Sequence, residues 1–188
     1  MRKLAVSLSA VGVLIAGCGS SSAPVNPNAK EHNPPGDIPD NQVFVDYRPA
    51  GAGFVVKVPE GWARRTNGHG VVFTSSLNSV AVEGRSATAA PTPAQARRLL
   101  IPQLAKSKSG FRLLAVNVVR RPAGPALHLV YQTQSRPSAV TGKRTVQTVE
   151  RYIFYRGGRE AVLTLSGAQG ADNVDPWRTV SSSLRWTA

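Results

Sequence analysis

The stretch that decides the fold is Gly53-Phe54-Val55-Val56-Lys57-Val58-Pro59-Glu60-Gly61-Trp62. Its β-branched and aromatic residues from Phe54 to Val58 predict a short strand, because such side chains pack well on a pleated, half-buried surface. Pro59-Glu60-Gly61 is a turn signature that ends the strand. Trp62 then places a large aromatic side chain behind the turn, where it is suited to burial. This segment predicts a β-rich domain of short strands and tight turns.

Further strands are predicted on both sides of this segment. Leu127, Leu129 and Tyr131 alternate with the residues between them, which is the period of a strand with one buried face. Gly157-Gly158 suits a two-residue primed turn that joins two strands into a hairpin. The predicted strands span residues 43–47, 54–58, 71–74, 80–83, 111–121, 126–134, 145–156 and 160–166.

A first helix is predicted between the fourth and fifth of these strands. It opens at Thr92-Pro93-Ala94-Gln95, in which Thr92 suits the N-cap, Pro93 the first helical position and Gln95 the third position of a capping box. Leu99, Leu100 and Leu104 give it an uneven apolar face up to Ser107. Pro102 is expected to kink or shorten this helix.

A second helix is predicted at the C-terminal end of the chain. Asp175 is expected to cap it, Pro176 suits its first turn, and Trp177, Val180 and Leu184 are its apolar residues. Consecutive hairpins make a sheet antiparallel, and the two helices remain to cover its faces. The order of elements therefore predicts an α+β fold with a largely antiparallel sheet covered by helices.

The N-terminus has the pattern of an export signal. Arg2 and Lys3 precede an apolar stretch of about 13 residues, which is too short to cross a bilayer as a helix of about 20 residues. The stretch ends in Leu14-Ile15-Ala16-Gly17-Cys18, which looks like a bacterial lipobox. Residues 1–17 are therefore predicted to be a lipoprotein signal peptide, which signal peptidase recognises through Leu14, Ile15, Ala16 and Gly17.

The rest of the chain divides into a tether and a domain. Cys18 is the only cysteine, and it is predicted to be lipidated on its thiol and, after cleavage, acylated on its amine, which makes a stable anchor. Residues 18–41, which begin at this cysteine, are rich in Ser, Pro and Asn without apolar periodicity, and predict an extended tether. Residues 42–188 suit one domain. These features predict a domain at the outer face of the plasma membrane, attached to the lipid bilayer through acylated Cys18.

The composition excludes several kinds of chemistry. One cysteine excludes an intrachain disulfide framework and Cys-rich zinc or iron–sulfur sites, and three histidines leave little for a multi-His centre. We therefore expect no cofactor and no metal.

The positive charge is the strongest physical signal in the composition. The formal net charge of +13 predicts attraction to an anionic partner, such as anionic lipid, a wall polymer or an envelope protein. Nucleic acid is not expected, because the basic residues are spread over different elements without interleaved exposed aromatic residues. The main basic clusters are Arg64-Arg65, Arg97-Arg98, Arg120-Arg121, Lys143-Arg144, and Arg156 with Arg159.

The histidines do not predict a catalytic site. His128 lies on a predicted strand between two leucines, His69 lies between glycines in an expected hairpin loop, and His32 lies in the tether. The chain contains no Gly-x-Ser-x-Gly nucleophile elbow. We therefore expect no catalytic residue. The alternative is a hydrolase, which requires a Ser/His/Asp cluster in the folded domain.

One acidic segment has oxygen ligands that could suit a metal. Asp172, Asn173 and Asp175 are spaced in a loop, as calcium ligands are, but they lack the spacing and the late glutamate of an EF-hand. The favoured role is structural, with Asp175 as the cap of the following helix and Asp172 beside its positive end.

Aromatic side chains are candidates for a ligand groove. Trp62, Trp177 and Tyr155 are the residues we assign to it, because aromatic clefts are common binding sites. Core packing is the alternative for Trp62 and Trp177.

The sequence resembles the PsbP/Mog1-like family. The resemblance is carried by Gly53–Trp62 and by the closing run from Tyr152 through Gly157-Gly158-Arg159 and Leu163-Thr164-Leu165 to Val180–Trp186. Where the family often has Ser-Phe, this chain has Ser183-Leu184. The resemblance implies an α/β/α sandwich. With its lipobox, the sequence is also similar to actinobacterial lipoproteins that carry such domains. It also implies an accessory, assembly or binding role rather than catalysis.

The expected function is therefore non-catalytic binding at the cell envelope by a membrane-anchored, extracytoplasmic lipoprotein. Two alternatives remain open. One is a cell-envelope hydrolase, and the other is a basic structural protein bound to anionic envelope polymers, for which binding would be steeply salt-dependent.

The anchor has a direct test. A Cys18→Ala chain should take no radiolabelled lipid and should leave the membrane fraction, because the thiol that carries the diacylglycerol is gone. Labelling and cell fractionation of the two proteins measure both effects. A wild-type chain without label, together with a variant that stays on the membrane, would contradict the prediction.

Overall fold

The computed structural model describes residues 36–68, 70–138 and 140–187. The predicted signal peptide, Cys18 and most of the predicted tether, 18–41, lie outside the described residues, as do His32 and His69. The described residues belong to one compact unit, His32–Ala188. Within them, no helix has the length and apolar character needed to span a bilayer.

The described residues form strands and helices in the expected order, with two strands that the sequence did not predict. The strands are β1 (Phe44–Tyr47), β2 (Phe54–Pro59), β3 (Ala63–Asn67), β4 (Gly70–Ser75), β5 (Asn78–Ser86), β6 (Arg112–Arg121), β7 (Gly124–Gln134), β8 (Val146–Arg156), β9 (Arg159–Ala168) and β10 (Arg185–Trp186). The helices are α1 (Pro93–Gln95), the π-helical η1 (Ala96–Leu100), α2 (Ile101–Ser107) and α3 (Val174–Ser182). The unpredicted strands are β3, which is polar and short, and the two-residue β10.

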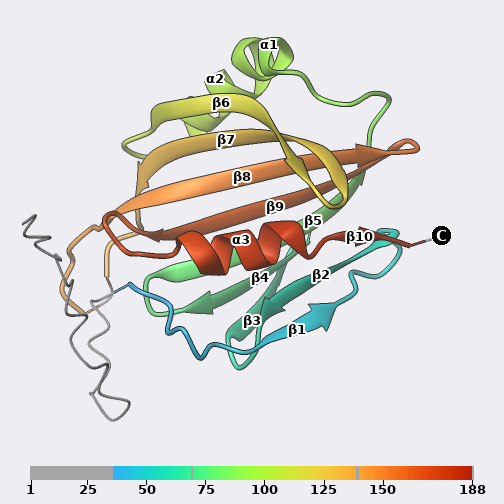
Figure 1. Cartoon of the computed structure of the whole chain (residues 1–188). Helices are drawn as coiled ribbons and strands as arrows, with labels where there is room; N and C mark the ends of the chain where they lie inside the picture. Colours follow the sequence, from blue (N-terminus) through green and yellow to red (C-terminus); the bar gives the residue numbers. More distant parts are fainter. Residues whose placement is uncertain (1–35, 69, 139, 188) are drawn as a thin grey trace, which may run out of the picture. The chain divides into compact units, whose positions relative to one another are not determined.

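The main sheet has seven strands in the order β3-β4-β5-β9-β8-β7-β6 among the described residues, and all neighbours are antiparallel. It consists of two meanders, β3-β4-β5 and β6-β7-β8-β9, which are joined where β5 pairs with β9. Gly157 and Gly158 both have positive φ, 53° and 81°, in the turn between β8 and β9, as the predicted primed turn requires. The prediction of an α+β fold with a largely antiparallel sheet is confirmed (Figure 1).

The first two predicted strands do not join this sheet. β2 pairs with β1 on one side and with β10 on the other, so the three strands form a separate small sheet. Every residue of β2 except Lys57 is buried. Phe54, Val56 and Val58 lie in one core cluster with residues of α3 and the main sheet. This arrangement depends on β10, which comes from the far end of the chain.

The main sheet has an apolar core on each face. One core contains Phe54, Val56 and Val58 of β2, and Trp177 and Val180 of α3, packed on the main sheet. The other contains Ala96 and Leu104 of the 93–107 helix, packed on Leu127, Leu129 and Tyr131 of β7 and on neighbouring strands. As the alternation along residues 126–134 predicts, alternate side chains of β7 point to opposite faces of the sheet. Figure 1 shows α3 and the α1–α2 helix on different sides of the sheet.

The 93–107 helix begins as predicted. Thr92 Oγ1 accepts a hydrogen bond from Gln95 N at 3.2 Å, and Thr92 N donates to Gln95 Oε1 at 3.0 Å, so the capping box is complete. Pro102 does not end the helix. The turn before it is π-helical, with Ile101 N bonded to Ala96 O, and this wider turn accommodates a residue that has no N–H to donate.

The cap predicted for the C-terminal helix is wrong by two residues. Asn173, not Asp175, is the N-cap of α3. Asp175 lies in the first turn with an exposed side chain and pairs with Arg178 at 3.0 Å. The buried Asn173 side chain instead accepts from Ile38 N at 2.9 Å and donates to Gly36 O and Asn78 Oδ1. It thereby ties residues 36–38 to β5 and α3, which a local capping rule does not anticipate.

Asn173→Ala should lower the free energy of unfolding by about 2 kcal/mol, because the buried Ile38 N–H loses its acceptor and Asn78 Oδ1 loses its donor. Urea denaturation of the full chain measures the loss. Asp175→Asn is the matched control and should cost less than about 1 kcal/mol, since it removes only an exposed ion pair and a helix-end charge. Equal losses in the two variants would contradict this assignment.

Candidate functional site

A cleft lies at one end of the main sheet, where the loop between β1 and β2 meets the ends of β3, β4, β5 and β9. Its volume is about 650 Å³, which is in the usual range for sites that bind small molecules. Small residues make much of its wall. The cleft is lined by Tyr47, Arg48, Pro49, Ala50, Gly51, Ala52, Arg64, Thr66, Gly68, Gly70, Val71, Gly84, Arg85, Ser86 and Arg159. We call it the arginine cleft.

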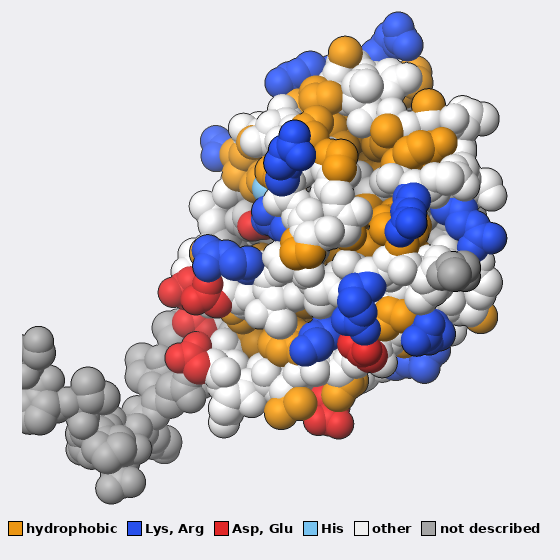
Figure 2. Space-filling model, turned by 45° about the vertical axis from the view of Figure 1, so that its right-hand side comes forward, with side chains coloured by type: hydrophobic (Ala, Val, Ile, Leu, Met, Phe, Trp, Pro, Cys, Tyr) orange, Lys and Arg blue, Asp and Glu red, His pale blue; other side chains and the backbone are white. Residues whose placement is uncertain are grey.

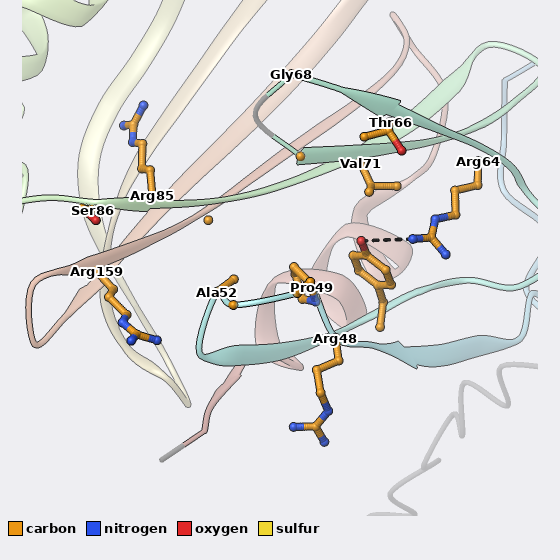
Figure 3. A pocket seen from close by; sticks show the side chains of 15 residues that line it. Arg48, Pro49, Ala52, Arg64, Thr66, Gly68, Val71, Arg85, Ser86 and Arg159 are labelled. Atoms are coloured by element: carbon orange, nitrogen blue, oxygen red, sulfur yellow. Dashed lines mark hydrogen bonds between the residues drawn. The ribbon is translucent and has the colours of Figure 1, made fainter.

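Three exposed arginines give the arginine cleft its charge. Arg48, Arg64 and Arg159 stand on different sides of it in Figure 3. Arg64 lies over the ring of Tyr47, with its guanidinium carbon 5.0 Å from the ring centre. Within the described residues, the guanidinium groups of Arg48 and Arg159 form no hydrogen bond or ion pair. Arg48 and Arg159 are therefore available to a ligand, whereas Arg64 also donates to the Tyr47 hydroxyl at 3.5 Å.

Arg85 differs from these three. Its Nε lies 2.6 Å from Oε2 of the buried Glu160, and in Figure 3 its side chain points away from Pro49 and Ala52 of the β1–β2 loop. The carboxylate of Glu160 neutralises this guanidinium. Arg85 therefore lines the cleft without adding a free charge to it.

Gly53 allows the β1–β2 loop to approach Arg159. Its φ is +75°, a conformation that other residues rarely adopt. A Cβ at this position would collide with the guanidinium of Arg159. The close contact places Arg159, which begins β9, beside a loop that precedes it by a hundred residues of chain.

The polar groups of the arginine cleft are suited to an anion. None of the described residues that line it is acidic. Asp46 and Glu83, which lie near it in the chain, are in ion pairs with Arg185 at 2.7 Å and with Arg151 at 3.8 Å. Guanidinium groups bind phosphate and carboxylate through pairs of N–H donors. The arrangement therefore provides donors and positive charge where no protein carboxylate competes.

Basic side chains are also visible over much of one face of the molecule (Figure 2). Figure 2 brings forward the right-hand side of Figure 1, where the β8–β9 turn and β10 lie. Lys and Arg side chains are scattered over this face among apolar ones, whereas Asp and Glu gather toward its left and lower margins (Figure 2).

A second polar cluster lies on the face of the sheet that carries α3. His128 Nε2 is 3.1 Å from Glu150 Oε2, and Tyr152 donates to the same oxygen at 2.5 Å. The His128 and Tyr152 rings stack with centroids 4.3 Å apart. Arg121 donates to the Tyr152 hydroxyl at 3.2 Å and to Ser181 Oγ of α3 at 3.1 Å. The cluster joins β6, β7, β8 and α3.

The proton affinities in this cluster are shifted by burial and by neighbours. Burial, followed by the hydrogen bond to Glu150 and the charge of that carboxylate, raises the pKa of Tyr152 to about 12. Burial by itself would raise the pKa of Glu150, but hydrogen bonds from His128 and Tyr152 lower it overall. The cluster therefore favours an ionised Glu150 and a neutral Tyr152.

The histidine and the acidic segment considered as candidate sites in the sequence make hydrogen bonds within the fold. Among the described residues, His128 is hydrogen-bonded to Glu150 and not to a serine or an aspartate, and no group of His, Cys, Asp and Glu side chains could hold a metal ion. Asp172 donates its backbone N–H to Asp37 Oδ1 at 3.0 Å. Asn173 and Asp175 have the roles at α3 given above.

The aromatic side chains assigned to a groove are separated. Trp177 is buried in the core beneath α3. Trp62 donates from Nε1 to Gln42 at 3.1 Å and lines a cleft of about 380 Å³ near Pro39 and Ser76. Tyr155 donates its hydroxyl to Thr88 O at 3.3 Å. The arginine cleft is lined by none of the three.

Sequence reasoning named part of the arginine cleft but did not assemble it. Arg64 and Arg159 belong to basic clusters that the sequence places on different elements, and the structure brings both to the arginine cleft. Arg48 was missed, although its place beside Pro49 and Gly51 marks a loop. The pairing of β5 with β9, which brings these residues together, has no local signal in the sequence.

Solved structures with a similar fold were found. The PsbP of the cyanobacterium Synechocystis sp. has 15% sequence identity and a TM-score of 0.57 over 80% of this chain and 98% of that one. The Ran-binding protein Mog1p of Saccharomyces cerevisiae has 9% identity and a TM-score of 0.50 over 77% and 96%. LpqN of Mycobacterium tuberculosis, a protein involved in cell envelope biogenesis, has 15% identity and a TM-score of 0.47 over 79% and 93%.

The first two similarities show that this chain has the PsbP/Mog1-like fold, as the sequence resemblance implied. At these identities the likeness is one of fold alone. No protein-family model and no curated protein sequence matches the chain.

The raised pKa of Tyr152 predicts a stability change in alkali. The pKa of Tyr152 is about 12 in the folded chain and about 10 in the unfolded chain, so the neutral side chain stabilises the fold. This stabilisation is fully present below pH 10 and is lost as the pH rises through 12. The wild-type chain should therefore lose about 2–3 kcal/mol more stability than Tyr152→Phe between pH 9 and pH 12. Urea denaturation across this range measures both curves, and parallel curves would refute the prediction.

Proposed function

We propose that this protein is a non-catalytic binding protein of the cell envelope that holds an anionic group, such as a phosphate or carboxylate, in the arginine cleft. In this proposal the domain is attached to the outer face of the plasma membrane through acylated Cys18. The residues that bind the anion are Arg48, Arg64 and Arg159, and the hydroxyl groups of Thr66 and Ser86 are further donors.

One observation carries the binding proposal. The arginine cleft combines about 650 Å³ of space with three guanidinium groups and no acidic lining residue among those described. Asp46, Glu83 and Glu160 each pair with a different arginine, so none of them neutralises Arg48 or Arg159. An anion that enters the cleft therefore replaces no protein carboxylate.

The proposal favours binding over hydrolysis. A hydrolase of the serine class needs a nucleophile, a base and an orienting carboxylate within hydrogen-bond reach of one another. His128 has a carboxylate neighbour but is stacked on Tyr152, and no serine hydroxyl hydrogen-bonds to it within the described residues. The arginine cleft itself contains donors and cations but no described group suited to act as a general base.

The test uses the full chain carrying Cys18→Ala, so that lipidation does not contribute to binding. Titration calorimetry with pyrophosphate should detect binding that weakens as salt is added. Arg48→Gln and Arg159→Gln should each lower the affinity about tenfold, the loss expected for one charge-assisted contact of 1–2 kcal/mol. Arg97→Gln, which removes the same charge from the exposed face of the 93–107 helix, should leave the affinity unchanged within about twofold.

A second arm distinguishes the source of the anion. Co-sedimentation with vesicles of phosphatidylglycerol, compared with vesicles of phosphatidylcholine, tests a lipid headgroup as ligand. Loss of both pyrophosphate and vesicle binding in Arg159→Gln indicates one site for the shared phosphate chemistry. Equal effects of Arg97→Gln and Arg159→Gln would instead indicate diffuse attraction by net charge and would refute a site in the arginine cleft.

A further inference from the structure

A smaller cleft adjoins the arginine cleft at the turn between β8 and β9. Its volume is about 260 Å³, and it is lined by Gly53, Arg156, Gly157, Arg159, Trp186 and Thr187. Thr187 N donates to Gly53 O at 2.9 Å, which holds the end of β10 against the start of β2. We call this space the turn cleft.

The two clefts share part of their walls. Arg159 and Gly53 line the turn cleft, and Arg159 also lines the arginine cleft. The Arg159 guanidinium lies against Gly53, where a Cβ would collide with it. One cation therefore stands at the boundary of both spaces, with Arg156 beyond it on one side and Arg48 and Arg64 on the other.

The turn cleft has a positive and an apolar part. Arg156 is exposed, and its guanidinium forms no hydrogen bond or ion pair within the described part of the chain. Trp186 is half-buried, with its ring against Phe54 and its Nε1 donating to Ala123 O at 3.3 Å. Because that N–H is used inside the protein, the rest of the indole offers an apolar surface. None of the described residues lining the turn cleft is acidic.

We infer that the two clefts together bind a polyanionic chain, with successive anionic groups at Arg48 and Arg64, at Arg159 and at Arg156. This inference rests on the proposed function and specifies its ligand as a polymer or oligomer of phosphate-type groups rather than a single anion. The linkers between the anionic groups pass Trp186. Binding one chain at several adjacent cations gains affinity because each further contact is intramolecular.

The polyanion accounts for the placement of charge better than two unrelated ligands do. Two separate anions would repel each other across Arg159 when both bind. In a chain, covalent bonds already hold the charges close together, so binding adds little further repulsion. The arginines lie on four elements, the β1–β2 loop, β3, β8 and β9, so they form a path rather than a single point. Guanidinium groups along a path suit a chain of regularly spaced charges.

The experiment compares long-chain polyphosphate with pyrophosphate on the same full chain, again with Cys18→Ala. The protein with all cleft arginines unchanged should bind polyphosphate at least about tenfold more tightly than pyrophosphate, when the polyphosphate concentration is counted in chain ends. Arg156→Gln should weaken polyphosphate binding about tenfold and leave pyrophosphate binding unchanged. It should also make the plot of log affinity against log salt concentration shallower by roughly one. Arg97→Gln is the charge-matched control.

The outcomes separate this inference from the proposed function. If Arg156→Gln leaves polyphosphate affinity and its salt slope unchanged while Arg48→Gln weakens pyrophosphate, the arginine cleft stands and the polyanion path is refuted. If Arg48→Gln and Arg159→Gln do not affect pyrophosphate, the proposed function itself fails. If Arg97→Gln matches Arg156→Gln on polyphosphate, the attraction is nonspecific, and the path is again refuted.

Discussion

The antiparallel pairing of β5 with β9 is the constraint on which the rest of this structure depends. It joins two meanders that are each built from neighbouring hairpins, and it makes them one sheet with a core on each face. The same register sets Arg85 opposite Glu160 and Ser86 opposite Arg159. Because the two strands are separated by the helix and three other strands in the chain, this pairing closes the longest loop in the main sheet. It therefore carries the largest loop-closure cost of any pairing in that sheet.

Electrostatic consequences follow from that register. Strand ends and turns from distant parts of the chain meet at one end of the sheet, and their arginines meet with them. Two acids at this end, Glu83 and Glu160, are paired with Arg151 and Arg85, which lie on the main sheet. The arginines that remain, on the loop before β2 and at the start of β9, have no carboxylate partner among the described residues. Leaving these charges unpaired costs the fold little, because exposed ion pairs contribute little to stability. The same charges can attract an anionic ligand.

The fold and the function have different kinds of support. The PsbP/Mog1-like fold follows from the topology and from the similarity to solved structures. One fold serves many functions, so the proposed binding role comes from the clefts and not from the fold. The partly buried cluster of His128, Glu150 and Tyr152 shows why the fold and the residue types alone do not give the function. It contains residue types that catalysis uses, yet its hydrogen bonds serve to hold β7 and β8 together and, through Arg121, to attach α3.

The sequence by itself determined the features that depend on neighbouring residues. The capping box at Thr92, the primed turn at Gly157-Gly158 and the alternation along β7 are local, because backbone geometry and side-chain period are set within a few residues. Only the tertiary structure decided which strands share a sheet, why Asn173 rather than Asp175 caps α3, and which arginines meet. Those outcomes depend on contacts between residues far apart in the chain, such as Asn173 with Gly36 and Arg159 with Gly53. Local propensity carries no information about such contacts.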